Sequence, residues 1–413
     1  MNFMWGSLLL GSGLLLLPAP SFAQSERPDY ELPPISYSKS RPHDAVARLL
    51  ERIQKKEVGF TGPDKDVLQT VLRELDVPVE SQIMVFSKTS MQGSLINPRN
   101  PRVLYFSDSV YVGWVPGGLI EVAAMDAELG PVYYTLDPQD ARDARRAFVR
   151  ETSCLRCHGE NEGDEIPALL ASSVLTTKEG EVIEGQGSKP MNESMPFKQR
   201  WGGWFVTGYT GAEDHLGNAH AQNPRPSDVS EFFDTSKYLV PTSDIRALLV
   251  FEHQASMHNV LTRSSHRARR ALMSAQAPLD DHTRAILAEV AQEIVDHLLF
   301  KDAAPLPRGI ETNADFQRAF TMEAPRDGKG CSLKDFSNKG RLFENRCSFL
   351  IYSESFAALP FQLKSVVFEQ LRAALDVSTP NGRYGYLERD EREKIVMILA
   401  GTLPEDQSFF RGR

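Results

Sequence analysis

The sequence predicts an α+β fold that is predominantly helical, with a small antiparallel sheet near the N-terminus, an irregular middle segment and a helical C-terminal half. Three observations indicate this class. Apolar residues recur at helical spacing before residue 80, β-branched and aromatic runs separated by Pro, Gly and Asn follow between 82 and 136, and helical spacing returns after 240. A chain of 413 residues is too long for one simple core, so we expect it to divide into two or three units.

Residues 1–23 are predicted to be a secretory signal peptide. Leu8 to Leu17 is an apolar run, and Ser21 and Ala23 place small residues at the ends of a cleavage site before Gln24. This pattern predicts a periplasmic or otherwise exported protein with no membrane span after cleavage. Because residues 1–6 contain no Lys or Arg, an N-terminal anchor retained in the membrane is the alternative.

Residues 24–42 are rich in Pro, Ser and charged residues, so we expect an extended lead-in. Residues 43–136 are predicted to form a small α+β domain. Its two helices are indicated by the i, i+3, i+4, i+7 spacing of Val46, Leu49, Leu50 and Ile53, which Leu68, Val71, Leu72 and Leu75 repeat. Its antiparallel strands are indicated by the apolar runs 83–86, 103–106, 110–115 and 132–134.

The segment 137–226 is organised around the motif Cys154-x-x-Cys157-His158, which a charged helix over Asp137 to Arg150 is expected to precede. Two thiols three residues apart, followed at once by a histidine, form the attachment pattern of a c-type haem. Each thiol adds to one vinyl group while the imidazole binds the iron. We therefore predict one covalent haem c in a cytochrome c-like segment, held by Cys154 and Cys157 with His158 as proximal iron ligand. The other ring nitrogen of His158 is expected to donate to a backbone carbonyl or a carboxylate.

A disulfide and a half-complete zinc site are the two alternatives to a haem at this motif. A zinc site would need two further ligands of the same kind nearby. The remaining cysteines, Cys331 and Cys347, lie far along the chain. They enclose a short loop of their own, where either a disulfide or two free thiols are compatible with the sequence.

The distal iron ligand is predicted to be His215, with His253 and His258 as alternatives. His215 follows Trp201-Gly202-Gly203-Trp204 and precedes Gly217-Asn218, a turn whose Asn could accept its second N–H. Other side chains of suitable type are Met191, Met195, His220 and Met257. The Trp-Gly-Gly-Trp segment is expected to be either an aromatic wall beside the haem or a tight turn in a hydrophobic core, and Phe148 either a porphyrin contact or an ordinary core residue.

Residues 240–302 are predicted to be a helical region, broken near Pro278, and residues 303–413 a mostly helical C-terminal region. Within the latter, Phe349 to Tyr352 is expected to be a strand, and Leu363 to Leu375 and Arg389 to Leu403 to be helices.

A formal net charge of −9 argues against a nucleic-acid partner. The chain contains no Walker A loop, no HExxH, no GxSxG and no Rossmann glycine fingerprint. Composition and motifs therefore indicate no nucleotide or hydrolase chemistry.

The chain resembles a group of uncharacterised secreted bacterial proteins classed as c-type cytochrome-domain proteins with a single Cys-x-x-Cys-His haem site. The resemblance lies in Ser153 to Gly159, Arg200 to Gly208 and His215 to Asn218, and extends to Glu252 to Gln254, Met257 to Asn259 and Cys347 to Ser353. It implies haem binding and electron transfer, and it implies no substrate.

These expectations combine into a periplasmic mono-haem c-type cytochrome that exchanges one electron at a time with a redox partner protein. An electron carrier or redox subunit is favoured over a stand-alone enzyme. The alternative is a haem enzyme or sensor that binds peroxide or a diatomic gas at an open iron position, and a third hypothesis makes the haem a structural staple of an interaction protein.

Overall fold

The computed structural model describes residues 27–141, 143, 147–160, 163–185, 188–209, 214–218, 228–378 and 382–403. The predicted signal peptide or anchor of residues 1–23 and the candidate ligand His220 lie outside these ranges. Within them, none of the helices is apolar over the length that a bilayer crossing requires.

A seven-stranded antiparallel sheet is the centre of the fold, in the order β6-β5-β4-β3-β2-β1-β9. Its strands are β1 (Ile83–Val85), β2 (Arg102–Phe106), β3 (Val110–Trp114), β4 (Ile120–Asp126), β5 (Gly130–Leu136), β6 (Val149–Arg150) and β9 (Trp204–Phe205). A separate pair joins β7 (Ser172–Val174) to β8 (Ser188–Pro190). The mixed α and β class is confirmed, but the predicted small N-terminal sheet is wrong, because β6 and β9 extend it on both sides.

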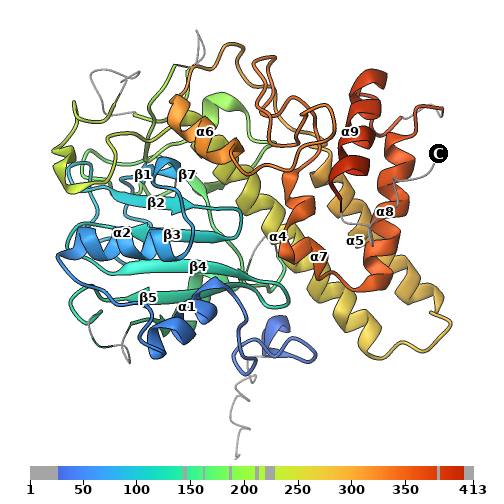
Figure 1. Cartoon of the computed structure of the whole chain (residues 1–413), viewed down its shortest axis with the longest axis horizontal. Coiled ribbons are helices and arrows are strands. Elements are labelled where there is room, and N and C mark those ends of the chain that lie inside the picture. Colours follow the sequence, from blue (N-terminus) through green and yellow to red (C-terminus); the bar gives the residue numbers. More distant parts are fainter. Residues whose placement is uncertain are drawn as a thin grey trace, which may run out of the picture.

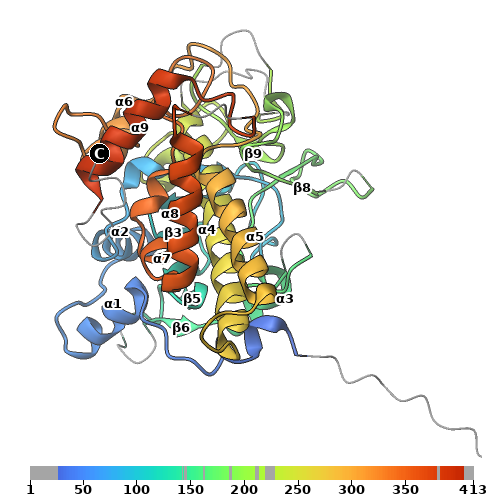
Figure 2. The same cartoon turned by 90° about the vertical axis from the view of Figure 1, so that its right-hand side faces the viewer.

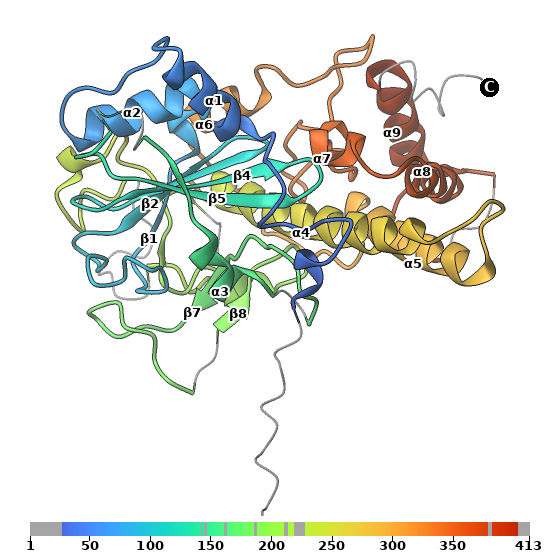
Figure 3. The same ribbon diagram turned by 90° about the horizontal axis from the view of Figure 1, so that it is seen from below.

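Two helices cover one face of this sheet, hereafter the α1/α2 face. Side chains at alternate strand positions, such as Val112 and Val122, point to this face and share a core with α1 (Ala45–Gln54) and α2 (Asp64–Glu74). Figure 3 shows both helices on one side of the sheet, with α3, β7 and β8 on the other. The two amphipathic helices predicted from apolar spacing are therefore confirmed.

The opposite face, hereafter the α4 face, packs against α4 (Ile245–Met273), the longest described helix. Asp244 caps its N-terminus by accepting from the backbone N–H groups of Arg246 and Ala247. Helix α5 (Asp281–Leu298) packs along α4, and α8 (Phe361–Leu375) packs on α5 (Figures 1 and 2). The predicted helical region and its break near Pro278 are confirmed. The remaining helices are α3 (Leu155–His158), α6 (Ala314–Thr321), α7 (Glu354–Ala357) and α9 (Arg389–Thr402).

The helix predicted over Asp137 to Arg150 is wrong for the described residues. They form turns and strand β6, and the Asp137 side chain accepts from the backbone N–H of Gln139 at 2.9 Å, which closes a turn at Pro138. Phe148 is an ordinary core residue, edge-on to Phe60 with ring centroids 6.3 Å apart. This charged segment carries no apolar stripe, so a helix formed here would have no apolar face to pack against the core.

The strand predicted at Phe349 to Tyr352 is also wrong, since this run is a 3₁₀ helix. Ser348 caps it by accepting from the backbone N–H of Leu350 at 3.3 Å. A short apolar run buried on all sides has no periodicity that separates a strand from a helical turn.

Cys331 and Cys347 are both free thiols, and Cys347 is fully buried. Burial raises the pKa of the Cys347 thiol to about 12, which makes it unreactive. We expect two free thiols per chain, apart from Cys154 and Cys157, when the denatured protein is titrated with a thiol reagent. A count of zero would show a disulfide between them.

Candidate functional site

The Cys154-x-x-Cys157-His158 motif lies on one continuous stretch of helical backbone. A 3₁₀ turn over Thr152–Cys154 leads directly into α3. Residues three apart on such a turn lie on the same side. Both thiols are free, Cys157 is exposed and Cys154 is partly exposed. The thiols therefore lie at the surface, where a large planar group can reach both.

Strand β6 sets the position of the motif at the edge of the sheet. It pairs with β5, and the backbone N–H of Glu151 donates to the Tyr133 carbonyl at 2.8 Å. On the α1/α2 face, the Arg150 guanidinium donates to the carbonyls of Tyr37 and Ser40 and lies over the Tyr37 ring, 4.8 Å from its centroid. The backbone entering the motif is thus held by hydrogen bonds within the sheet and by the Arg150 side chain on one of its faces.

The His158 ring has the backbone-carbonyl partner predicted from the sequence. Its Nδ1 lies 2.9 Å from the carbonyl oxygen of Ala168, an acceptor, so Nδ1 carries the proton. The Tyr133 hydroxyl donates to the same oxygen at 2.5 Å, and its ring lies 4.9 Å from the imidazole centroid. These contacts fix the tautomer and leave the Nε2 lone pair available to a metal.

Helix α4 holds the segment that carries Ala168. The Asn259 side chain accepts from the Leu169 N–H and donates to the Leu169 carbonyl, both at 2.8 Å. The Ala168 N–H in turn donates to the His158 carbonyl at 2.8 Å. A buried amide on the longest helix therefore orients the imidazole through one intervening segment.

Burial changes the acidity of both groups of the motif. It lowers the pKa of His158 below its usual value, so the imidazole is neutral, as a metal ligand must be. Burial, with the neighbouring carboxylates of Glu151 and Glu121, raises the pKa of the Cys154 thiol to about 11. Because a thiolate is the reactive nucleophile, Cys154 is protected from unassisted chemistry.

A partly open row of residues crosses the α4 face beside the motif. Val149, Thr135, Glu121 and Gly113 are paired in register on neighbouring strands. Val149 is 54% exposed although it belongs to the sheet. The Arg102 guanidinium occupies the space above Gly113 that a side chain would fill and pairs with Glu121 at 2.5 Å. This row combines the exposed apolar side chain of Val149 with the ion pair of Arg102 and Glu121.

His215 lies in an aromatic cluster, with ring centroids 5.0 Å from Trp201 and 6.0 Å from Phe197. Trp201 is fully buried and donates from Nε1 to Glu252 of α4. The site of His158 is connected to α4 at Asn259, about 10 Å further along the helix. The Trp-Gly-Gly-Trp segment is thus a turn in the core, which was one of its two predicted roles.

The other proposed distal ligands are buried within α4 and its surroundings. His253 Nε2 lies 2.7 Å from the Ser348 hydroxyl, and His258 Nε2 lies 2.9 Å from the Asp108 carbonyl. Burial lowers the pKa of His253 to about 3 and of His258 to about 4. Met191, Met195 and Met257 are buried as well. No hydrogen bond or ring contact of the described chain joins His253 or His258 to His158, so the distal ligand stays a prediction.

Tyr133, Ala168 and Asn259 are the residues around His158 that sequence reasoning did not assign. Asn259 entered only through the resemblance, and Tyr133 only as part of a strand. Polar residues inside an otherwise buried helix such as α4 are the signal that could have indicated Asn259, because a buried amide requires partners.

Comparison of the chain with protein-family models, with curated proteins and with solved structures gives no match. In the described part of the chain, no three His, Cys, Asp or Glu side chains are grouped to hold a bare metal ion. A zinc site at Cys154 and Cys157 would therefore lack further ligands among those residues.

Proposed function

We propose that this protein is an exported mono-haem c-type cytochrome that transfers single electrons to or from a partner protein. The observation that carries the proposal is the hydrogen bond from His158 Nδ1 to the Ala168 carbonyl, next to two accessible thiols at attachment spacing. It leaves Nε2 as the free donor atom, which is what a proximal haem histidine requires. A disulfide or zinc site gives no reason for a half-buried, oriented imidazole directly after the second cysteine.

Cys154, Cys157 and His158 would hold the haem, which supplies a reversible one-electron couple when bound. The chain's own contribution is orientation and apolar contact. Tyr133 and Asn259 hold the Ala168 segment and so keep the imidazole in one tautomer. Val149, exposed beside the motif, provides apolar contact.

Covalent haem is the expected result when the full-length chain is exported by a host with cytochrome c maturation. The polypeptide should keep a haem stain after denaturing electrophoresis and after acid-acetone extraction. A Cys154→Ser, Cys157→Ser double variant should lose the stain, whereas Cys331→Ser should keep it. An extractable haem, or a stain unaffected by the double variant, would overturn the proposal.

The second candidate function is a haem enzyme or sensor with an open iron position. One observation supports it: His253 and His258, two of the possible distal ligands, already use Nε2 in buried hydrogen bonds. Carbon monoxide distinguishes the two functions. A six-coordinate iron that does not bind carbon monoxide supports the electron carrier. A ferrous absorption spectrum that shifts when carbon monoxide is added supports the enzyme or sensor. If His215→Ala converts the first behaviour to the second, His215 is the distal ligand.

A further inference from the structure

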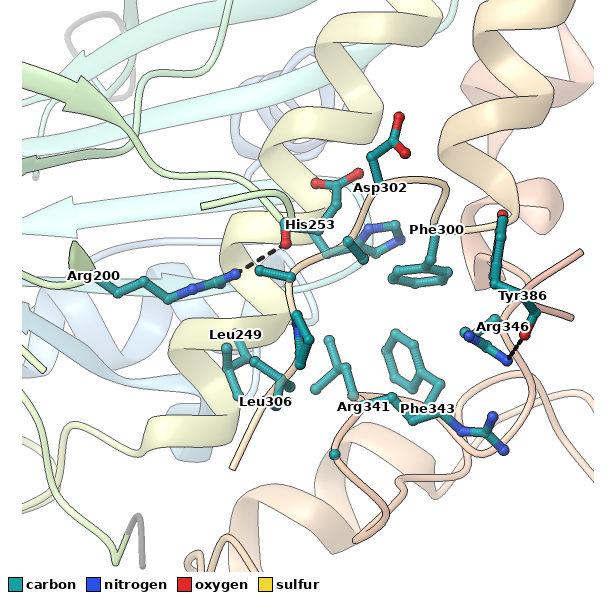
Figure 4. A pocket seen from close by; sticks show the side chains of 16 residues that line it. Arg200, Leu249, His253, Phe300, Asp302, Leu306, Arg341, Phe343, Arg346 and Tyr386 are labelled. Atoms are coloured by element: carbon teal, nitrogen blue, oxygen red, sulfur yellow. Dashed lines mark hydrogen bonds between the residues drawn. The ribbon is translucent and has the colours of Figure 1, made fainter. Parts of the chain in front are cut away.

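A cavity of about 340 Å³ lies on the far side of α4 from the sheet, apart from the haem motif. Leu249 and His253 of α4 form one wall, the loop after α5 contributes Phe300 to Leu306, and the loop before the 3₁₀ helix at Phe349 closes it (Figure 4). Its volume is at the lower end of the range for small-molecule pockets.

The middle of the cavity is apolar. Phe300 and Phe343 lie with ring centroids 5.8 Å apart, and Leu249 and Leu306 line the space opposite them (Figure 4). The imidazole of His253 stacks on the Phe300 ring at 4.3 Å and holds it in place. These walls suit a compact apolar or aromatic body.

One end of the cavity carries more positive than negative charge. Arg341 and Arg346 both pair with one carboxylate, that of Glu391, at 3.1 and 2.6 Å. The Arg346 guanidinium also donates to the Tyr386 carbonyl at 2.7 Å, which fixes its direction. Two cations therefore share one anion at this end, so the three groups together carry a net charge of +1.

Arg200 and Asp302, elsewhere on the cavity wall, have partners of their own, and burial raises the pKa of the remaining charged residue, Glu193, which favours its neutral form. Arg200 pairs with the buried carboxylate of Glu252. Asp302 pairs with Lys301, which precedes it in the chain. The uncompensated charge of the cavity therefore lies at the end that Arg341 and Arg346 line.

Three lining residues each carry a buried polar atom without a hydrogen-bond partner: Glu193 Oε2, His253 Nδ1 and Arg341 Nε. His253 is only 1% exposed. These atoms are covered by their own neighbours and do not face the open space, so they lie behind the cavity wall and are not contacts for a bound molecule.

We propose that this cavity binds a small organic carboxylate with an apolar or aromatic body. The carboxylate would lie against Arg346, and the body between Phe300, Phe343 and Leu249. The cavity shares no residue with the Cys154-x-x-Cys157-His158 motif, but it includes His253, one of the alternative distal ligands.

The test uses phenylacetate as probe and the neutral phenylacetamide as its matched control, titrated calorimetrically into the purified full-length protein. We expect saturable binding of phenylacetate and at least about tenfold weaker binding of the amide. Arg346→Gln, which removes the cation, should lose about tenfold or more in affinity. Ala303→Leu, which fills the cavity without removing a polar contact, should abolish binding, and Ala285→Leu on the exposed side of α5 should leave it unchanged.

Equal binding of acid and amide would overturn the proposal, as would phenylacetate binding that survives Ala303→Leu. Absence of binding by the folded wild-type protein up to about 10 mM probe would also overturn it, and would indicate that ordered water fills the cavity. Thermal melts of each variant separate a lost site from a lost fold. None of these outcomes depends on the haem stain that tests the proposed function.

Discussion

Arg200→Leu is expected to lower the free energy of unfolding by about 3–5 kcal/mol, because it leaves the carboxylate of Glu252 buried without its cation. Both side chains are almost fully buried, at 2% and 1% exposure. Arg200 also donates from Nε to the Met195 carbonyl and from Nη2 to the Glu193 carbonyl, both at 3.0 Å. The substitution therefore removes one positive charge. It also leaves three hydrogen-bond acceptors without their donor: the Glu252 carboxylate and the carbonyls of Met195 and Glu193.

Urea denaturation of the wild type and the variant measures this loss. Arg389→Leu is the matched control, since Arg389 pairs with Glu393 on an exposed face of α9 and should cost less than about 1 kcal/mol. The double change Arg200→Leu, Glu252→Leu should recover part of the stability because no unpaired charge remains. If Arg200→Leu costs no more than Arg389→Leu, the buried pair is not formed in solution.

Acid is expected to destabilise the protein through His266, which is buried in α4 as a neutral imidazole. Burial, together with the nearby cations of Arg269 and Arg270, lowers the pKa of His266 to about 4, although the Glu128 carbonyl at 3.2 Å opposes this shift. In the unfolded chain the pKa of His266 is near 6.5, so at acidic pH the unfolded chain binds a proton that the folded chain does not bind. Above about pH 6.5 this difference in proton binding has little effect on the free energy of unfolding. As the pH falls toward 4, the free energy of unfolding decreases, by about 2 kcal/mol at pH 5.

Denaturation at about pH 7 and about pH 5, compared between wild type and His266→Gln, measures this contribution. The variant should lose about 2 kcal/mol less than the wild type over that interval. His282→Gln, at an exposed position in the first turn of α5, should behave as the wild type does. An unchanged pH dependence in His266→Gln would show that His266 is protonated in the folded protein.

The sequence by itself determined the features that depend on neighbours along the chain. Helices α1, α2, α4, α5, α8 and α9 follow from apolar spacing that each segment carries alone. The geometry of the Cys154-x-x-Cys157-His158 motif is local in the same sense, because these residues occupy one continuous stretch of helical backbone. The need of His158 for a backbone acceptor could also be predicted, since it follows from the chemistry of an imidazole ligand.

Only the tertiary structure decided which distant groups meet. Strand β9 has two residues and no alternating pattern of its own, and it becomes part of the sheet because β1 offers a free edge. The acceptor of His158 is the carbonyl of Ala168, a group that every residue possesses, and its position depends on Asn259 about ninety residues later. The sharing of Glu391 by Arg341 and Arg346, which makes one end of the cavity cationic, likewise joins loops that sequence spacing does not relate. Backbone partners and charge balance are set by packing between segments, and a periodic pattern within one segment carries no information about them.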